Sequence, residues 1–588
     1  MTFLRELLAV ILGVFISFFI MFFVLIAIGS ALGSAFGEED KIKVKNNSIL
    51  VLKLEESIKD YAPKSSDPFV EYLGLKEKNM GLNDIINAIE NAKYDDNILG
   101  ISIEAMQLQS GISQIQAIRD KLYEFKESGK FITAYADVYD QKNYYLSSVA
   151  DSLYVNPAGG LDFKGLSGEL LFFKDFQDKY GVKMEVIRHG KYKSAVEPFL
   201  ANEMSEANRE QTTSFLNAIW SEIVNDISEN RNLTNEELNH IADELLARTP
   251  DLAVENKMIS NKLYKDEYVD VLKKMTELNQ GSDLHVISLV DYISSGKGRI
   301  KSTSKNRIAV IYAQGEIKYG KGDENYVGQE LIIKALQKAR KESSVKAIVL
   351  RVNSPGGSAL ASDMIWRELE LTKKEKPLVV SMGDVAASGG YYIACNADRI
   401  IAQPTTITGS IGVFGAIPNM SGLAGRMGIN AEQIGTNKQS VGYSIFEPIS
   451  DDFYKVTKEG VEQVYTTFVE KVAAGRNMTF ARVDSIAQGR VWTGQEALSN
   501  GLVDELGSLE DAVSIAANLA EIDTYRIRNY PVYEKNIEDM FKGPFASMKQ
   551  SVLKNELGIE NYRIYKNMKQ FSDLKGMQTR LPFLLEIN

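Results

Sequence analysis

The chain contains the same segment twice, and this duplication constrains the fold more than any other feature. The stretch LVVSMGDVAASGGYYIACNAD at 378–398 aligns with FITAYADVYDQKNYYLSSVAD at 131–151, at an offset of about 247 residues. A repeat of this length indicates one structural unit present twice, so the fold must be built from two similar halves. Within the repeat, Ser388 of the second copy is replaced by Gln141 in the first.

The two copies differ in a complementary way further along the chain. At the same offset, Lys193 in KYKSAVEPF falls opposite Ser440 in KQSVGYSIF. The first copy therefore has a lysine without the serine, and the second has Ser388 without the lysine. Because each copy of a fused duplication can lose what its neighbour supplies, this pattern predicts a serine hydrolase whose nucleophile and base come from different halves.

Short apolar runs alternate with amphipathic stretches in both copies. ILGISIEA at 98–105 and VKAIVLRVN at 345–353 are typical of buried strands, and each follows a stretch with helical apolar spacing. This alternation predicts an α/β fold with largely parallel strands. We expect four parts: an N-terminal transmembrane anchor at 1–30, a first copy at 47–290, a second copy at 306–530 and a C-terminal extension at 531–588.

Composition excludes several classes of protein. The net charge of −11 and the pI near 5.2 argue against nucleic acid as a partner, because a phosphate-binding surface needs a basic excess. The single cysteine, Cys395, excludes a disulfide framework and is expected to be a small buried side chain. His189, His240 and His285 all precede the second copy, so a Ser-His-Asp triad cannot form within that half. No metal or cofactor is expected.

An uncharged apolar run occupies residues 7–29. About 20 such residues span a bilayer as a helix, whereas the apolar region of a cleaved signal is about 7–15 residues long, so a transmembrane anchor is the favoured interpretation. The small residues at 30–35 leave removal of the segment as the alternative. Arg5 precedes the run and three lysines follow it, so the basic residues do not decide on which side of the membrane the body lies.

Ser388 follows a predicted strand at a glycine-rich turn, and such a turn lifts a serine hydroxyl away from the backbone. Lysine can act as its base only when neutral, which requires burial to lower a pKa of about 10.4 by roughly 3 units. The N–H groups of Gly389 and Gly357 are candidate oxyanion donors. Ser410 either hydrogen-bonds Lys193 or caps a turn.

Each residue also has a simpler structural explanation. A Ser-Gly-Gly turn is most often only a turn, and Lys193 could be a solvated surface charge paired with Glu197. The complementary loss across the repeat is what favours catalysis for both.

Four segments carry a specific resemblance: VNSPGGSALAS, GDVAASGGYYIACNAD, QPTTITGSIGVFG and YKSAVEPF. They resemble the motifs of the signal peptide peptidase A (protease IV) family in its long, duplicated, membrane-anchored form, and the similarity runs from the anchor to about residue 520. Carried over to this chain, the resemblance implies Ser388 as nucleophile, Lys193 as general base, and Gly357 and Gly389 as the oxyanion glycines.

The resemblance also implies a fold similar to Clp protease and crotonases, and a bowl-shaped homotetramer. It further implies a body on the outer side of the bacterial cytoplasmic membrane, and cleavage of signal peptides and other apolar, extended peptides there. The extension beyond the repeat departs from the family pattern and has no assigned role. Two other functions stay open at this stage: a crotonase-like acyl-CoA enzyme and a non-catalytic membrane scaffold.

Overall fold

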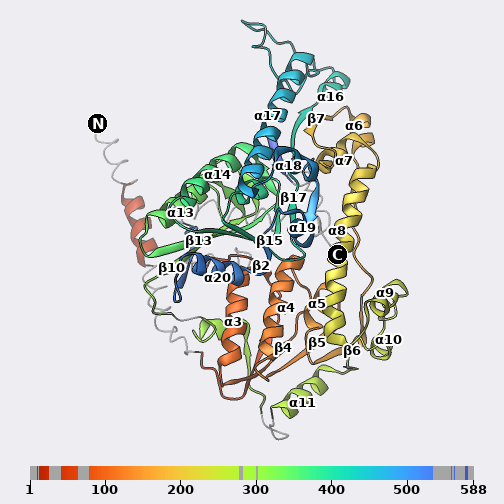
Figure 1. Ribbon diagram of the computed structural model, residues 1–588, viewed down its shortest axis with the longest axis vertical. Helices are drawn as coiled ribbons and strands as arrows, with labels where there is room; N and C mark the ends of the chain where they lie inside the picture. Colours follow the sequence, from red (N-terminus) through yellow and green to blue (C-terminus); the bar gives the residue numbers. More distant parts are fainter. Residues whose placement is uncertain are drawn as a thin grey trace.

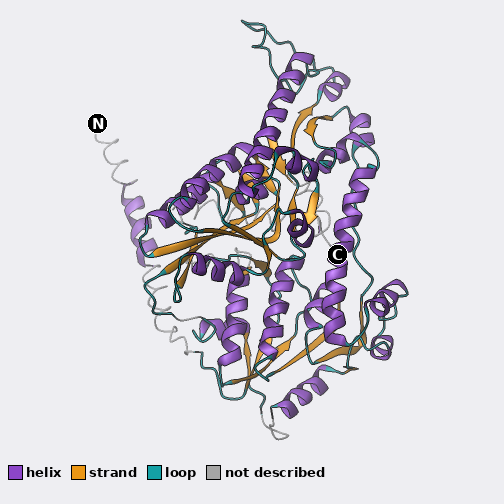
Figure 2. Cartoon of the chain, viewed as in Figure 1, coloured by secondary structure: helices purple, strands orange, loops and turns teal. Residues whose placement is uncertain are grey.

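The structure is a computed structural model. It describes residues 10, 12–24, 42–63, 79–276, 283–299, 302–533, 556, 558, 562 and 577–580. Its architecture is the mixed α/β fold that the sequence predicts, with two mainly parallel sheets, each covered by helices, and a third sheet between the halves (Figures 1 and 2). The first sheet lies at the lower end of Figure 1 and the second lies near the middle.

The first sheet has six strands, and all its neighbouring pairs are parallel. Parallel strands need crossover connections, which the intervening helices supply. The strands, in spatial order, are β8 (Asn261–Lys262), β6 (Ser152–Leu161), β5 (Phe131–Tyr139), β4 (Ile98–Ile103), β1 (Ser48–Leu52) and β9 (Val286–Ser288). The helices of this half are α3 (Leu82–Tyr94), α4 (Ile112–Lys126), α5 (Gln141–Ser147), α8 (Glu206–Arg231), α9 (Asn235–Asp243), α10 (Pro250–Glu255), α11 (Lys265–Met275) and α12 (Leu289–Ser294).

The second sheet has eight strands, parallel except where β17 meets β19. Its main path runs β19 (Val491–Thr493), β17 (Ile407–Gly409), β15 (Leu378–Ala387), β13 (Val345–Ser354), β10 (Arg307–Gln314) and β21 (Arg526–Tyr530), with β16 (Arg399–Ala402) beside β15 and β20 (Glu505–Leu506) beside β16. Its helices are α13 (Gln329–Lys341), α14 (Ala359–Lys373), α15 (Gly389–Ala394), α16 (Ser421–Arg426), α17 (Asp451–Arg476), α18 (Phe480–Ile486), α19 (Gly494–Asn500) and α20 (Leu509–Leu519).

The duplication is visible in matched polar contacts. The carboxylate of Asp151 accepts the N–H of Ile132 at 2.9 Å, and Asp398 accepts the N–H of Leu378 at 2.9 Å. The hydroxyl of Tyr144 on α5 donates to a backbone carbonyl at 2.8 Å, and that of Tyr391 on α15 does so at 2.9 Å. Both copies therefore fix the strand before the turn and the helix after it in the same way.

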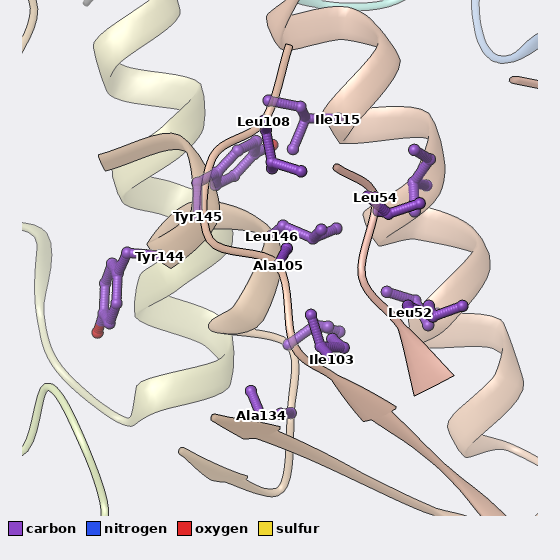
Figure 3. Packing of buried hydrophobic residues seen from close by; sticks show 14 of the residues in the cluster. Leu52, Leu54, Ile103, Ala105, Leu108, Ile115, Ala134, Tyr144, Tyr145 and Leu146 are labelled. Carbon is purple, nitrogen blue, oxygen red and sulfur yellow. The ribbon is translucent and has the colours of Figure 1, made fainter. Parts of the chain in front are cut away.

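Apolar packing holds each sheet to its helices. In the first half, Leu52, Ile103 and Ala134, on three neighbouring strands, belong to one buried apolar cluster with Leu146 of α5 (Figure 3). All four side chains are fully buried, and burying each large one contributes about 1.5–3 kcal/mol.

A third sheet joins the two halves. It has six strands, in the order β12 (Tyr326–Gly328), β11 (Glu316–Lys318), β14 (Gly356–Ser358), β22 (Met577–Arg580), β18 (Val413–Asn419) and β7 (Lys183–His189). β7 comes from the first half, yet it pairs antiparallel with β18 of the second half over its whole length. Helix α6 (Lys174–Tyr180) precedes β7 in the chain. After β7 come the short helices η1 (Ser194–Val196) and α7 (Glu197–Leu200). In Figure 1 these segments lie beside α16 and α17, far from the first sheet.

The predicted anchor lies only partly within the described residues. Residues 12–24 are helical and their apolar side chains are exposed, while most of the remainder of 7–29 lies outside the described part. Where the structure describes the chain, it holds no helix with both the length and the apolar character needed to cross a membrane. Most of the extension at 531–588 also lies outside the described residues.

Candidate active site

Ser388 lies at the junction between β15 and α15, where it caps the helix. Its backbone has φ 55° and ψ −115°, a combination that non-glycine residues rarely adopt and that costs about 1–3 kcal/mol. The N–H of Ser388 donates to the carbonyl of Gly409 on the neighbouring β17 at 2.8 Å, which holds the turn in place. The sequence expectation of a sharp strand–turn–helix at this serine is therefore met.

Lys193 lies in the turn that follows β7, inside the second half of the molecule. The N–H of the preceding residue, Tyr192, donates to the carbonyl of Gln488 at 2.8 Å. Two glycines leave space for the lysine stem: an added Cβ on Gly489 would lie 2.7 Å from Lys193 Cβ, and one on Gly412 would lie 3.1 Å from Lys193 Cδ. The pairing of β7 with β18 thus carries this lysine into the other half.

The structure brings the two predicted residues into contact. Lys193 Nζ lies 2.8 Å from Ser388 Oγ, and it also lies 3.0 Å from Ser410 Oγ and 3.1 Å from Ser410 O. All three side chains are 0 % exposed. The sequence left two roles open for Ser410, a hydrogen bond to Lys193 or the cap of a turn, and the structure shows the hydrogen bond to Lys193.

The surface-charge alternative for Lys193 is not met. Within the part of the chain that the structure describes, no carboxylate forms an ion pair with Lys193, and Glu197 instead binds the hydroxyl of Ser205 at 2.6 Å. Ser440, which the repeat offset sets opposite Lys193, lies in an exposed turn and donates to Asn437 O. The sequence offset here does not correspond to a shared position in the site.

Burial lowers the pKa of Lys193 well below its ordinary value of 10.5. The physical cause is desolvation, because the buried ammonium group loses its hydration and no carboxylate among the described residues compensates. A larger share of the side chain is therefore the neutral amine near neutral pH, and the neutral amine is the form that can accept a proton.

The predicted oxyanion glycines lie next to the serine. Gly357, in β14, has φ 152°, and an added Cβ there would lie 2.0 Å from the carbonyl oxygen of Ile317, so only glycine fits. An added Cβ on the preceding Gly356 would lie 2.7 Å from the amide nitrogen of Gly389. The glycine pair of β14 therefore lies against the first turn of α15.

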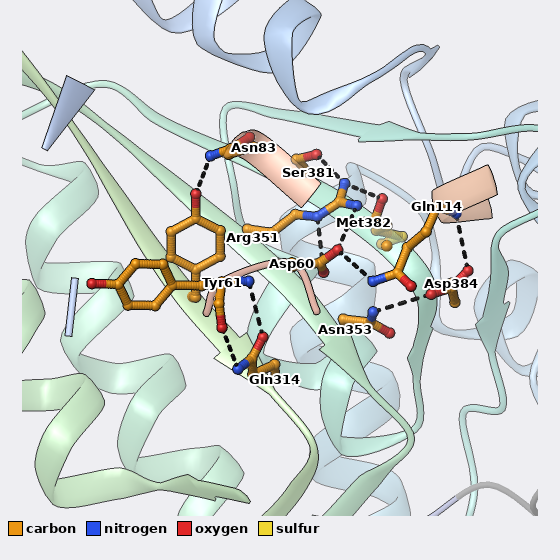
Figure 4. A network of polar contacts seen from close by, with 12 residues as sticks. Asp60, Tyr61, Asn83, Gln114, Gln314, Arg351, Asn353, Ser381, Met382 and Asp384 are labelled. Carbon is orange, nitrogen blue, oxygen red and sulfur yellow. Dashed lines mark hydrogen bonds and ion pairs between the residues drawn. The ribbon is translucent and has the colours of Figure 1, made fainter. Parts of the chain in front are cut away.

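A buried polar network ties the two halves together (Figure 4). The guanidinium of Arg351 on β13 pairs with the carboxylate of Asp60 at 3.1 Å, and both side chains are at most 2 % exposed. Gln114 of α4 donates its side-chain amide to Asp60 at 3.1 Å and its backbone N–H to Asp384 at 3.2 Å. Desolvation and the nearby Asp60 raise the pKa of Asp384 to about 6.

This network did not emerge from the sequence. Asp384 stands out in the repeat because it aligns with Asp137, but nothing local marks Asp60 as its neighbour.

The described histidines and the cysteine make contacts outside the Ser388–Lys193–Ser410 cluster. His189 contacts Glu462 at 2.6 Å and His285 contacts the carbonyl of Asn46 at 2.9 Å. Cys395 is fully buried, as expected, and burial raises the pKa of its thiol to about 12. Over the described residues, no group of three or more His, Cys, Asp or Glu side chains is arranged to hold a metal ion.

A serine in contact with a buried lysine is the arrangement found in serine peptidases that use lysine in place of histidine. Comparison with known families agrees with this class: the model of peptidase family S49 matches residues 124–279 and again 370–523. The chain belongs to peptidase family S49.

Similar proteins cover most of the chain. Protease 4 of Haemophilus influenzae is 38% identical over 74% of this chain and 72% of its own length. Protease 4 of Salmonella typhi is 35% identical over 79% and 77%, and the chloroplastic serine protease SPPA of Arabidopsis thaliana is 32% identical over 82% and 70%. The chain is therefore a serine endopeptidase. This finding argues against the two alternatives that the sequence left open, an acyl-CoA enzyme and a non-catalytic scaffold.

Among solved structures, a mutant of ClpP1 from Listeria monocytogenes aligns with a TM-score of 0.24 and 16% identity. The alignment covers 35% of this chain and 94% of that one. A TM-score this low supports no conclusion about a Clp-like or crotonase-like fold, so this finer part of the fold prediction stays a prediction.

Proposed function

We propose that this chain cuts extended apolar peptides with Ser388 as the nucleophile and Lys193 as the general base. The observation that carries the proposal is the 2.8 Å contact between Lys193 Nζ and Ser388 Oγ in a site closed to solvent. A serine hydroxyl needs an adjacent base to attack a peptide, and a desolvated amine is such a base.

In the first step, the hydroxyl proton of Ser388 passes to Lys193 Nζ while Oγ attacks the peptide carbonyl carbon. The N–H groups of Gly389 and Gly357 stabilise the oxyanion. Protonated Lys193 then gives its proton to the leaving amine as the C–N bond breaks. Water then attacks the acyl-enzyme while Lys193 takes its proton, and Lys193 passes this proton to Ser388 Oγ as the ester bond breaks and the acid product leaves. Ser410 holds Nζ in place between steps through its hydroxyl and carbonyl oxygens.

The substrate class follows from how the site presents its backbone. The edges of β14 and β18 that face each other, which β22 pairs with in this structure, are the edges where an extended peptide would add by β-pairing in its place. This mode recognises an unfolded backbone rather than a folded protein. The resemblance to signal peptide peptidase A supports signal peptides as substrates. We therefore expect cuts within Leu-, Ala- or Val-rich peptides, after small or medium apolar residues.

We further propose that residues 7–29 anchor the chain in the bacterial cytoplasmic membrane, with the body on the outer side and four copies in the assembly. The apolar run is long enough to cross a bilayer, for which about 20 residues suffice. The family resemblance supports the outer side and the homotetramer. Protease accessibility in spheroplasts tests the orientation, and light scattering of the detergent-solubilised chain tests the assembly.

Two measurements on the full chain in detergent test the activity. A serine-reactive fluorophosphonate should label the wild type but not Ser388→Ala, and labelling of both would remove Ser388 as the nucleophile. A synthetic signal peptide and a folded globular control are then incubated with the enzyme, and the cuts are mapped by mass spectrometry. Equal digestion of the folded control, or cutting mainly after charged residues, would contradict the proposed specificity.

A further inference from the structure

Lys193 lies in a short loop after β7, residues 190–194, which we call the lysine loop. The backbone of this loop is held from two sides. On one side, the carbonyl of Gln488 in the second half accepts the N–H of Tyr192 at 2.8 Å. On the other side lies α8 of the first half, which begins beside α7 and runs down toward α5 (Figure 1). The lysine loop is therefore enclosed between elements of both halves.

Gln211 of α8 contacts the lysine loop on both sides of Lys193. Its side-chain Nε2 donates to the carbonyl of Tyr192 at 3.1 Å and to the hydroxyl of Ser194 at 2.8 Å. Its Oε1 accepts the N–H of Val491, the first residue of β19, at 3.4 Å. The roles of the two ends of the amide are fixed, because a backbone carbonyl only accepts and a backbone N–H only donates. Gln211 thus ties the residues that flank the lysine to the second half.

These contacts are buried, which makes them specific to one position of the loop. The side chain of Gln211 is 1 % exposed and Ser194 is fully buried. A buried amide that loses its partners has no water to replace them, so a shift of the loop would leave polar groups unsatisfied. The buried amide therefore opposes movement of the lysine loop.

Gln211 holds the loop without adding a charge to it. Two ion pairs border the loop: Arg188 lies 3.7 Å from Glu197, and Arg490 lies 2.6 Å from Glu210. In each pair, a positive side chain faces a negative one. A carboxylate at position 211 would favour the ammonium form of the lysine, whereas a neutral amide fixes the backbone and leaves the amine form accessible.

The second copy has a different residue at the matching position. Helices α8 and α17 each have 26 residues, and they begin after the serine caps Ser205 and Ser450. Counted from these caps, Gln211 matches Val456, which is 62 % exposed. The buried glutamine therefore occurs in the copy that carries Lys193.

We propose that Gln211 is a positioning residue that holds Lys193 in place for proton transfer with Ser388. It acts through the backbone of Tyr192 and the hydroxyl of Ser194, and the inference rests on the proposed function of the serine and the lysine. Without the amide, the loop loses both ties to α8, so Nζ is no longer fixed 2.8 Å from Ser388 Oγ and water can reach it. A displacement of about 1 Å can lower a rate about 10²-fold.

The main test is Gln211→Met, which keeps the length of the side chain and removes both hydrogen-bonding ends. For an apolar peptide cut by the full chain in detergent, kcat should fall about 10- to 100-fold while KM changes by less than about threefold. The pH midpoint of kcat/KM should move upward, because hydration favours the ammonium form. Gln495→Met makes the same change at an exposed helical position and should match the wild type in all three quantities.

The pH midpoint separates positioning from a purely structural role. A folded Gln211→Met with the wild-type kcat and midpoint overturns the inference, even if its free energy of unfolding is lower. A lower stability alone is what a structural role predicts.

Ser194→Ala is the milder variant, since it removes one of the two ties and disturbs little packing. It should lower kcat about three- to tenfold and move the midpoint upward by a smaller amount. Combined with Gln211→Met it should cause no further loss, because both changes remove the same contact. Full additivity of the two losses would overturn the inference. If Gln211→Met does not fold, Ser194→Ala decides, and a wild-type kcat and midpoint there would overturn it.

Two reference variants distinguish failure of this inference from failure of the proposed function. Substantial turnover by Lys193→Arg would remove lysine as the base, and the role of Gln211 would fall with it. If Lys193→Arg and Ser388→Ala are inactive while Gln211→Met behaves like the wild type, the proposed function stands and only the role of Gln211 is overturned.

Discussion

The two strand–helix turns of the repeat occupy matching positions in their copies but use their side chains differently. In the first copy, Asp140 caps α5 by accepting the N–H of Asn143 at 2.8 Å, and the side chain of Gln141 accepts the N–H of Gly165 at 2.9 Å. In the second copy, Ser388 caps α15 without a side-chain hydrogen bond to the helix, has φ 55°, and turns its hydroxyl toward Lys193.

The strained backbone conformation lies at the Ser388 turn. The Gln141 turn uses its side chains to satisfy local backbone groups, which is the ordinary way to begin a helix. The Ser388 turn leaves its hydroxyl free of that task, and the neighbouring strand holds the turn through Gly409. One scaffold therefore supports two kinds of turn, and under the proposed mechanism the turn at Ser388 is the reactive one.

The largest expected effect comes from breaking the serine–lysine contact. Ser388→Ala and Lys193→Ala should each lower kcat/KM by at least about 10³-fold, and the double variant should be little worse because the pair acts as a unit. Lys193→Arg should fail equally, since a guanidinium stays protonated. Steady-state peptide hydrolysis measures this, with circular dichroism to check folding. Substantial turnover by Lys193→Arg would remove lysine from the mechanism.

Loss of the third member of the contact should have a smaller effect. Ser410→Ala removes the hydroxyl 3.0 Å from Lys193 Nζ but keeps the backbone carbonyl, so we expect kcat/KM to fall about 10- to 100-fold. Ser440→Ala is the control, because Ser440 is matched to Lys193 by the sequence offset but lies in an exposed turn. Equal losses in the two variants would show that the effect of Ser410 is not specific.

The pH dependence should report the buried lysine. Under the proposed mechanism neutral Lys193 is the active form, so kcat/KM should fall about tenfold per pH unit below its lowered pKa and level off above it. The unfolded chain keeps the lysine proton up to its ordinary pKa, so the free energy of unfolding should rise with pH between the two values. Lys193→Met should remove this slope, whereas the exposed Lys191→Met should keep both the slope and the rate profile. A rate profile whose midpoint lies at 10.5 would contradict the lowered pKa.

The structural turn should respond in stability rather than in chemistry. Gln141→Ala leaves the N–H groups of Lys164 and Gly165 without their acceptor, so it should lower the free energy of unfolding by about 1–3 kcal/mol. Gln495→Ala, at an exposed helical position, should change it by less than about 0.5 kcal/mol. Denaturant titration measures both. Gln141→Ser should not restore activity to Ser388→Ala, because Lys193 lies at the other turn.

The smallest effect is expected at the histidines. His189→Ala, His240→Ala and His285→Ala should each keep kcat/KM within about twofold of the wild type, since a lysine replaces the histidine of a conventional triad. Peptide hydrolysis by the three variants measures this. A folded variant that has lost activity would point back to a histidine base.

Several elements could be predicted because their signals are local. Alternating apolar runs and helical spacing predict the α/β fold, and the repeated segment predicts that the fold occurs twice. The sharp turn at Ser388 is predicted by a few adjacent residues where β15 ends and α15 begins. The complementary loss of lysine and serine singles out Lys193 and Ser388 without any contact being known.

The tertiary structure alone decided which distant groups meet. The 2.8 Å contact joins residues 195 positions apart, and it depends on β7 of the first half pairing with β18 of the second. The ion pair of Asp60 with Arg351 spans 291 positions, and β22 joins β14 across more than 200. The sequence determined the local elements and the chemistry of each half, because periodicity and turn residues act over a few positions. Which strand edges pair depends on packing of the whole chain, and no local pattern records it.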